Sequence, residues 1–114
     1  MDRDPLQLAS EIFSLIEDAA PERQTDLPTD VPRLVQRWTD DLKPPLVALG
    51  AADPDEDVRS AAVALRESGN AFFDLLVKGS KGMKVSDAEE FRSDLPTRHA
   101  TAMVAAEALL RAVA

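Results

Sequence analysis

The chain has 114 residues, of which 21 are acidic and 13 basic, for a formal net charge of −8, with no cysteine and a single histidine. This composition excludes a disulfide framework, a cysteine nucleophile and a zinc site built on thiolates. The excess of acid disfavours nucleic acid as a partner, because phosphate neutralisation needs clustered lysine and arginine. Since one domain typically has about 100–200 residues, residues 1–114 are interpreted as a single helical domain.

Targeting and membrane-spanning patterns are absent from the sequence. The first residues are charged, and no basic segment is followed by the apolar stretch of a secretory signal. The most apolar segment, residues 100–114, is shorter than the roughly 20 residues that a membrane span needs. We therefore expect a cytoplasmic protein with no membrane partner.

The chain shows helical periodicity between proline and glycine positions, without sustained strand-like alternation. The first predicted helix has Asp4 as its N-cap and Pro5 at its first position, where the missing N–H costs nothing. This helix is expected to end near Ala20, because Pro21 cannot continue it.

The second predicted helix begins just before Pro32 and stops at Pro44-Pro45. Residues 46–49 are then predicted to form one further turn, with Gly50 as its C-terminal cap. Within this helix Trp38, the lone tryptophan, has the phase of the apolar face, so we assign it to the core.

The third predicted helix repeats the start signal of the first, with Asp53 as cap and Pro54 at the first position. It should end at Gly79, beside Lys78. Its apolar positions follow the 4-3-4 spacing of a bundle seam: Val58, Ala62, Leu65, Gly69, Phe72 and Leu76. We expect Gly69, in mid-helix, to make room for a bulky neighbour such as Trp38.

The last part of the chain contains two helix-start signals. Ser86 and Glu89 form a capping box, which predicts a short helix carrying Phe91 inward. Pro96, preceded by an aspartate at 94, then predicts a second start and a final helix. The complete pattern predicts an all-α fold, an antiparallel four-helix bundle with one or two short extra helical turns.

The C-terminal helix is the most apolar, because only Glu107 and Arg111 are polar between residues 102 and 114. A bundle helix needs only an apolar stripe, so this helix is either central in its own bundle or covered by another chain. We hypothesise a homodimer, or a contact with another protein, made through this helix at Met103, Ala106, Leu109, Leu110 and Val113.

Charge is distributed unevenly, since residues 1–57 contain fourteen acidic and five basic residues. This half predicts a protein partner with a basic surface, attracted by long-range electrostatics. A small basic loop with glycines follows the third helix and is a secondary candidate for partner contact, through Lys78, Lys81 and Lys84. It lacks the spacing of a phosphate-binding P-loop.

The sequence favours a non-enzymatic protein–protein interaction or regulatory module, which means an adaptor, a chaperone-like factor or an inhibitor. Two other functions remain open. The spacing Arg92-x6-His99 resembles the arginine–histidine pair of the HEPN family of helical ribonucleases and toxin partners, with Ser93 replacing the usual Asn or Asp. The resemblance implies RNA cleavage by Arg92 and His99 from two protomers. The third possibility is a structural oligomer subunit. No metal or cofactor is expected, because the acids at residues 53–57 lack the glycine and glutamate of a calcium loop.

Overall fold

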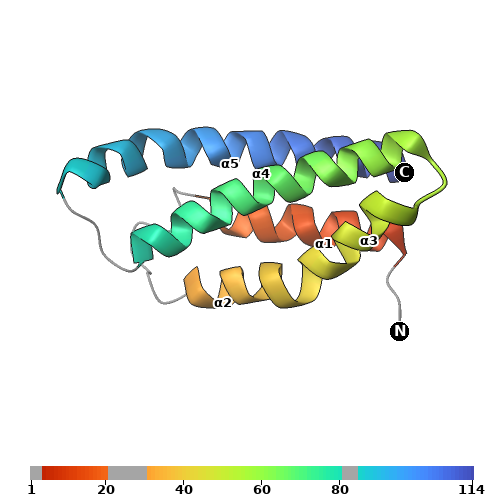
Figure 1. Cartoon of the computed structure of the whole chain (residues 1–114), viewed down its shortest axis with the longest axis horizontal. Helices are drawn as coiled ribbons and strands as arrows, with labels where there is room; N and C mark the ends of the chain where they lie inside the picture. The colour runs from red at the N-terminus through yellow and green to blue at the C-terminus, as the bar shows by residue number, and fades with distance from the viewer. Residues whose placement is uncertain (1–3, 21–30, 81–84) are drawn as a thin grey trace.

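The computed structural model describes residues 4–20, 31–80 and 85–114, and these residues form helices without strands. In chain order the helices are α1 (Pro5–Asp18), α2 (Val31–Gln36), a π-helical segment η2 (Arg37–Leu42), α3 (Lys43–Ala52), α4 (Glu56–Ser80) and α5 (Val85–Val113). Because α2, η2 and α3 follow one another without a break, four long helices alternate in direction along the chain (Figure 1). The predicted all-α antiparallel bundle is confirmed.

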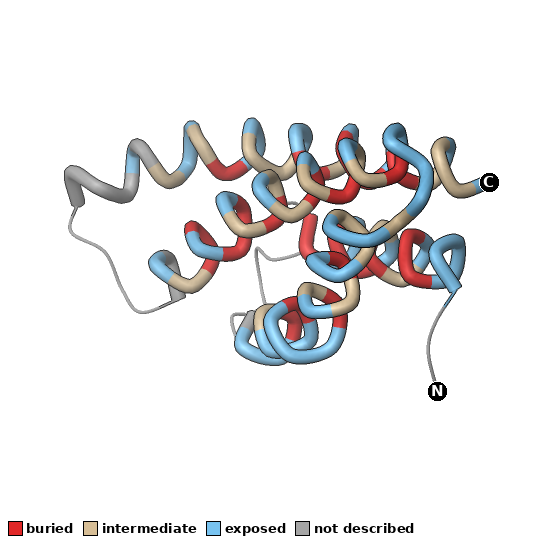
Figure 2. Tube along the Cα trace, turned by 45° about the vertical axis from the view of Figure 1, so that its right-hand side comes forward, coloured by how far each residue is buried: buried red, intermediate tan, exposed pale blue. Residues whose placement is uncertain are grey.

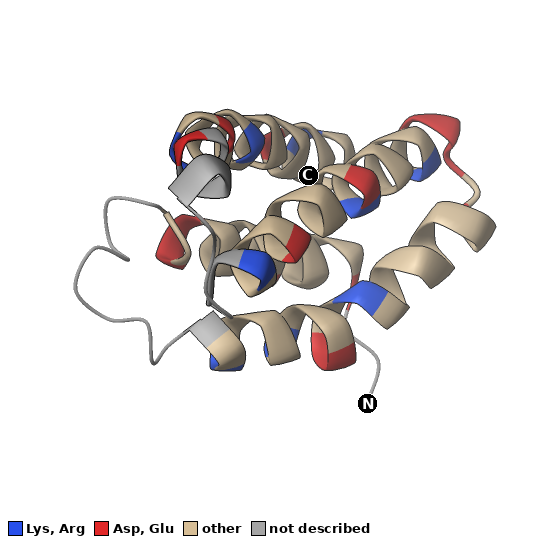
Figure 3. Ribbon diagram, turned by 60° about the vertical axis from the view of Figure 1, so that its left-hand side comes forward, with Lys and Arg blue, Asp and Glu red and all other residues tan. Residues whose placement is uncertain are grey.

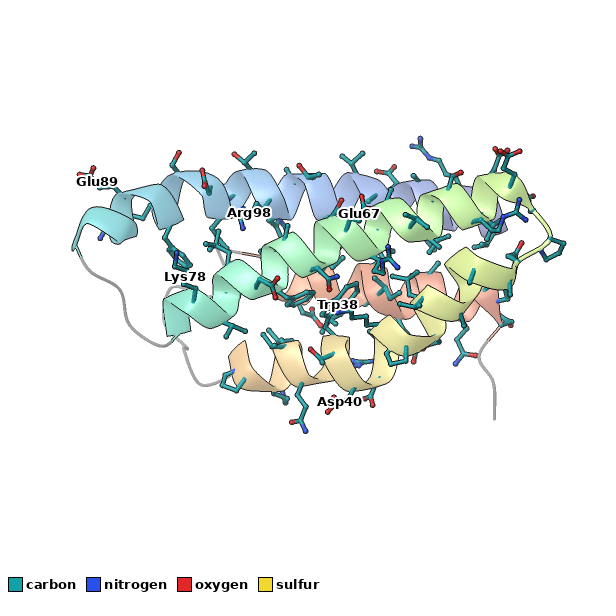
Figure 4. All side chains as sticks on the ribbon, in the orientation of Figure 1. Trp38, Asp40, Glu67, Lys78, Glu89 and Arg98 are labelled. Carbon is teal, nitrogen blue, oxygen red and sulfur yellow. The ribbon has the colours of Figure 1, made fainter. Side chains whose placement is uncertain are left out.

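All four helices contribute to one apolar core, and every buried residue in the described ranges other than glycine is hydrophobic. The seam predicted for α4 is buried along its whole length, from Val58 to Leu76. Trp38 is 2% exposed, which confirms its place in the core (Figure 4). Its ring stacks on Phe73 with centroids 5.3 Å apart, and its Nε1 donates a hydrogen bond of 3.1 Å to Oδ1 of Asn70.

The predicted stop at Pro44-Pro45 is wrong, because the helix continues through both prolines. In η2 the N–H of Lys43 donates to the carbonyl of Trp38, five residues back, as in a π-helix. This wider turn places Pro44 within the first turn of α3, where proline is tolerated. The extra turn predicted at residues 46–49 is therefore part of α3.

Gly50 lies inside α3, so its predicted role as a helix cap is also wrong. A Cβ built on Gly50 would lie 3.2 Å from Cγ2 of Val63 and 3.6 Å from Cβ of Ala62. The glycine therefore serves a close approach between α3 and α4 rather than a helix end.

The cap predicted for α4 is displaced by two residues, from Asp53 to Asp55. Asp53 has the extended backbone that a residue before proline prefers, and it ends α3. The carbonyl of Asp55 accepts the N–H of Arg59 at 3.0 Å, and its Oδ1 accepts the N–H of Asp57 at 2.8 Å. Asp55 is thus the N-cap, whereas Asp4 caps α1 as predicted, accepting the N–H of Gln7 at 2.7 Å.

The separate short helix predicted near Ser86 does not exist, because α5 is continuous from Val85 to Val113 with Pro96 in its interior. An interior proline removes one helical hydrogen bond and costs about 3 kcal/mol. Leu95 and Ala102, on either side of the proline, are both buried in the core, which offsets that cost. Tertiary packing therefore outweighs the local start signal.

Candidate functional site

One end of the bundle combines an apolar hollow with carboxylates. Helices α1 and α4 begin there, and α3 and α5 finish there (Figure 1). The hollow has a volume of about 370 Å³ and is lined by Asp4, Pro5, Leu6, Asp53, Val58, Ala112 and Val113. We call this surface the acid-rimmed end.

Five of the seven residues that line the hollow are apolar, and part of this lining is open to solvent. Leu6, on the first turn of α1, is 46% exposed although it is a large hydrophobic side chain. Val58 is buried beside it, and Val113 is half-buried on the last turn of α5. Contiguous exposed apolar surface marks interaction sites, and here Leu6 shares one hollow with the half-buried Ala112 and Val113.

The rim is acidic because helices begin at this end. Asp53 accepts the N–H of Asp55 at 2.9 Å through Oδ1. Three further acids follow at the start of α4, and all are exposed: Asp55, Glu56 and Asp57 (Figure 3). The N-termini of α1 and α4 offset only about +0.5 charge each, and Arg59, which donates to the carbonyl of Asp53, adds one positive charge. The five carboxylates at this end therefore leave an excess of negative charge.

Metal binding finds no support at this end. Among the residues that the structure describes, no group of three or more His, Cys, Asp or Glu side chains is placed to hold a metal ion. The carboxylates of Asp4, Asp53 and Asp55 instead accept backbone N–H groups, which fixes their orientation along the helix starts.

The residues predicted for association on α5 are distributed between the core and its edge. Ala106 and Leu109 have no exposed surface, because α5 packs against both α1 and α4 (Figure 2). Met103, Leu110 and Val113 are half-buried against the same core. The apolar excess of α5 is thus largely explained by its own bundle, and of these five residues only Val113 lines the acid-rimmed end.

The outer face of α5 has a different composition from the predicted contact. Val104 is 67% exposed there, and Arg111 donates to Glu107 at 2.7 Å in an exposed ion pair. Isolated exposed valines are common on protein surfaces, so this face carries no assembled site.

The predicted lysine contact is only partly within the structure. Lys78 is exposed on the last turns of α4 (Figure 4). Lys81 and Lys84 lie outside the described residues.

Arg92 and His99 lie seven residues apart on the continuous helix α5, but His99 is engaged in packing. Its Nε2 donates to the carbonyl of Ile16, 2.9 Å away in the last turn of α1, which fixes the tautomer because a carbonyl only accepts. Its ring also meets Phe72 edge-on, with centroids 5.2 Å apart. His99 thus joins α5 to α1, and Arg92 is exposed on the surface.

Sequence reasoning missed Leu6 and Asp4 as neighbours of Val113. The signal was present, because helices that alternate in direction place the starts of the first and third helices and the end of the fourth at one end of a bundle. Both starts carry an Asp-Pro pair, Asp4-Pro5 and Asp53-Pro54.

No helix within the described part of the chain is long and apolar enough to cross a membrane. Comparison of the chain with models of protein families, with curated proteins and with solved structures gives no match.

Proposed function

We propose that this chain is a non-enzymatic protein–protein interaction module whose acid-rimmed end binds a basic, partly apolar segment of another protein. The observation that carries the proposal is the exposure of Leu6 in the lining of a hollow that Asp4 and Asp53 also line. An adaptor, a chaperone-like factor and an inhibitor all fit this role. A cytoplasmic location and self-association belong to the same proposal.

The chemistry of the hollow specifies the partner segment. Its volume of about 370 Å³ suits one or two apolar side chains, and the surrounding carboxylates favour lysine or arginine next to them. The charge excess of residues 1–57 adds a long-range field that speeds encounter with a basic partner and weakens as salt rises.

The test uses a fluorescent peptide of alternating lysine and leucine, with an alternating glutamate and leucine peptide as the charge control. The wild-type chain should bind the first peptide and not the second, and raised salt should weaken binding. Leu6→Lys should abolish binding, because it introduces a like charge and removes the apolar contact. Val104→Lys is the matched control, since it makes the same change on the outer face of α5.

The site at which the peptide binds decides whether the proposal holds. Equal loss of binding in Leu6→Lys and Val104→Lys would show that the peptide follows overall charge rather than the hollow. In a separate experiment on the wild-type background, a photo-crosslinking amino acid at position 6 should capture the native partner from cell extract. The same group at position 104 should not capture it.

A further inference from the structure

Helix α4 carries a second surface that the acid-rimmed end does not use, and it lies beside the α3–α4 contact, where Val63 borders Gly50. A shallow hollow of about 360 Å³ runs along it, lined by Arg59, Ser60, Val63, Ala64 and Glu67. We call this surface the α4 stripe. Ser60, Ala64 and Glu67 are exposed, and Arg59 and Val63 are half-buried.

Two opposite charges lie symmetrically about Val63 on this stripe. Arg59 precedes Val63 by four residues and Glu67 follows it by four, so all three share one face of the helix. Each charged residue is displaced from Val63 by about 6 Å along the axis, at ~1.5 Å per residue.

Glu67 has no cation to pair with on its own helix. The residues three and four positions away are Ala64, Val63, Asn70 and Ala71. Among the described residues, the side-chain carboxylate of Glu67 has no hydrogen-bond or ion-pair partner. Arg59 uses one guanidinium nitrogen on the carbonyl of Asp53, and a guanidinium has five N–H donors in total.

We propose that a second copy of this chain docks on the α4 stripe, with the two α4 helices antiparallel and a two-fold axis at Val63. In that arrangement Arg59 of each copy faces Glu67 of the other, so the contact contains two equivalent ion pairs. The small side chains of Ser60 and Ala64 allow the helices to approach closely.

Self-complementarity selects the second copy as the occupant. A two-fold contact requires one patch to match itself when reversed, and a plus–apolar–minus stripe does so. A uniformly basic or uniformly acidic foreign helix would meet a like charge at one end of the stripe. This contact lies on α4, not on the residues of α5 for which the sequence predicted self-association.

Charge exchange between two variants tests the pairing. Sedimentation equilibrium should find the wild type dimeric at high micromolar concentration. Glu67→Arg and Arg59→Glu should each weaken the dimer by about tenfold or more, because each substitution places like charges opposite each other twice. Mixing the two variants in equal amounts should restore a dimer, because one chain then has arginine at both positions and faces a chain with glutamate at both.

Asp40→Arg is the matched control, because Asp40 is an exposed acid on η2, a helix that does not line the stripe, and its substitution should leave the dimer unchanged. A monomeric wild type, or an equimolar mixture that stays monomeric, would overturn the proposal.

Circular dichroism checks that Arg59→Glu folds, since Arg59 also holds the α3–α4 connection. If it does not fold, the comparison of Glu67→Arg with Asp40→Arg decides, and equal dimerisation of these two variants refutes the α4 contact. Leu6→Lys should dimerise like the wild type, which keeps this test separate from peptide binding at the acid-rimmed end.

Discussion

Gly69 and Trp38 form a matched pair across the core, because a Cβ at position 69 would lie 2.5 Å from Cη2 of the indole. Real Cβ atoms essentially never come this close to another heavy atom. The six-membered part of the indole occupies the space where any other residue would place its side chain. The expectation that Gly69 makes room for a bulky neighbour is confirmed.

Gly69→Ala should therefore lower the free energy of unfolding by up to about 2 kcal/mol. Alanine gains about 1 kcal/mol of helix propensity, but overpacking in a filled core costs about 1–3 kcal/mol, and the ring of Trp38 is rigid. Gly69→Leu should destabilise the protein further. Urea unfolding followed by circular dichroism measures both variants.

Gly50→Ala is the control for this effect. Its new Cβ would lie 3.2 Å from Cγ2 of Val63, a contact that a shift of a few tenths of an ångström relieves. Its stability should stay within about 1 kcal/mol of the wild type, because propensity gain and local crowding nearly cancel. A Gly69→Leu variant of native stability would contradict the packing argument.

Asn70→Ala should destabilise the protein by about 1–3 kcal/mol, because it leaves the indole N–H of Trp38 buried without its acceptor. The fluorescence of the lone tryptophan should keep the blue-shifted emission of a buried indole until the protein unfolds. Asn70→Asp, which keeps an acceptor oxygen, should recover part of the loss. Equal stability of the alanine variant and the wild type would show that this hydrogen bond contributes nothing.

The sequence predicted the helices and the core well, and their boundaries less well. Periodicity placed the seam of α4, because a buried helical face requires apolar residues at fixed spacing. The rule that proline ends or starts a helix failed at Pro44 and Pro96. A π-helical turn in one case and core contacts on both sides in the other kept the helix continuous. Neither the π-helical turn nor the core contacts leave a local pattern in the sequence.

The candidate site was harder to predict for a related reason. The acid-rimmed end joins residue 6 to residue 113, and only the assembled bundle brings them together. The apolar excess of α5 pointed to a second chain, whereas α1 and α4 cover most of it.

Pro96→Ala should raise the free energy of unfolding by about 1–3 kcal/mol, because alanine restores the backbone N–H that proline lacks in the interior of α5. Pro5→Ala is the matched control at the first position of α1, and it should change stability by less than about 0.5 kcal/mol. Thermal unfolding of both variants measures the difference. A Pro96→Ala variant less stable than the wild type would show that the proline ring itself packs to advantage.

His99→Ala should lower the free energy of unfolding by about 1–3 kcal/mol and leave RNA intact. The loss combines a hydrogen bond to the carbonyl of Ile16, about 0.5–1.5 kcal/mol, with an edge-on aromatic contact to Phe72 of similar size. Arg92→Ala, on the exposed surface, should change stability by less than about 0.5 kcal/mol.

An RNA degradation assay on the wild type and both variants separates a packing role from a catalytic one. Cleavage by the wild type that disappears in both variants, while both remain folded, would instead support the HEPN-like alternative. Equal background in all three proteins assigns His99 to the junction of α1 and α5, because a histidine that only joins two helices changes stability and not chemistry.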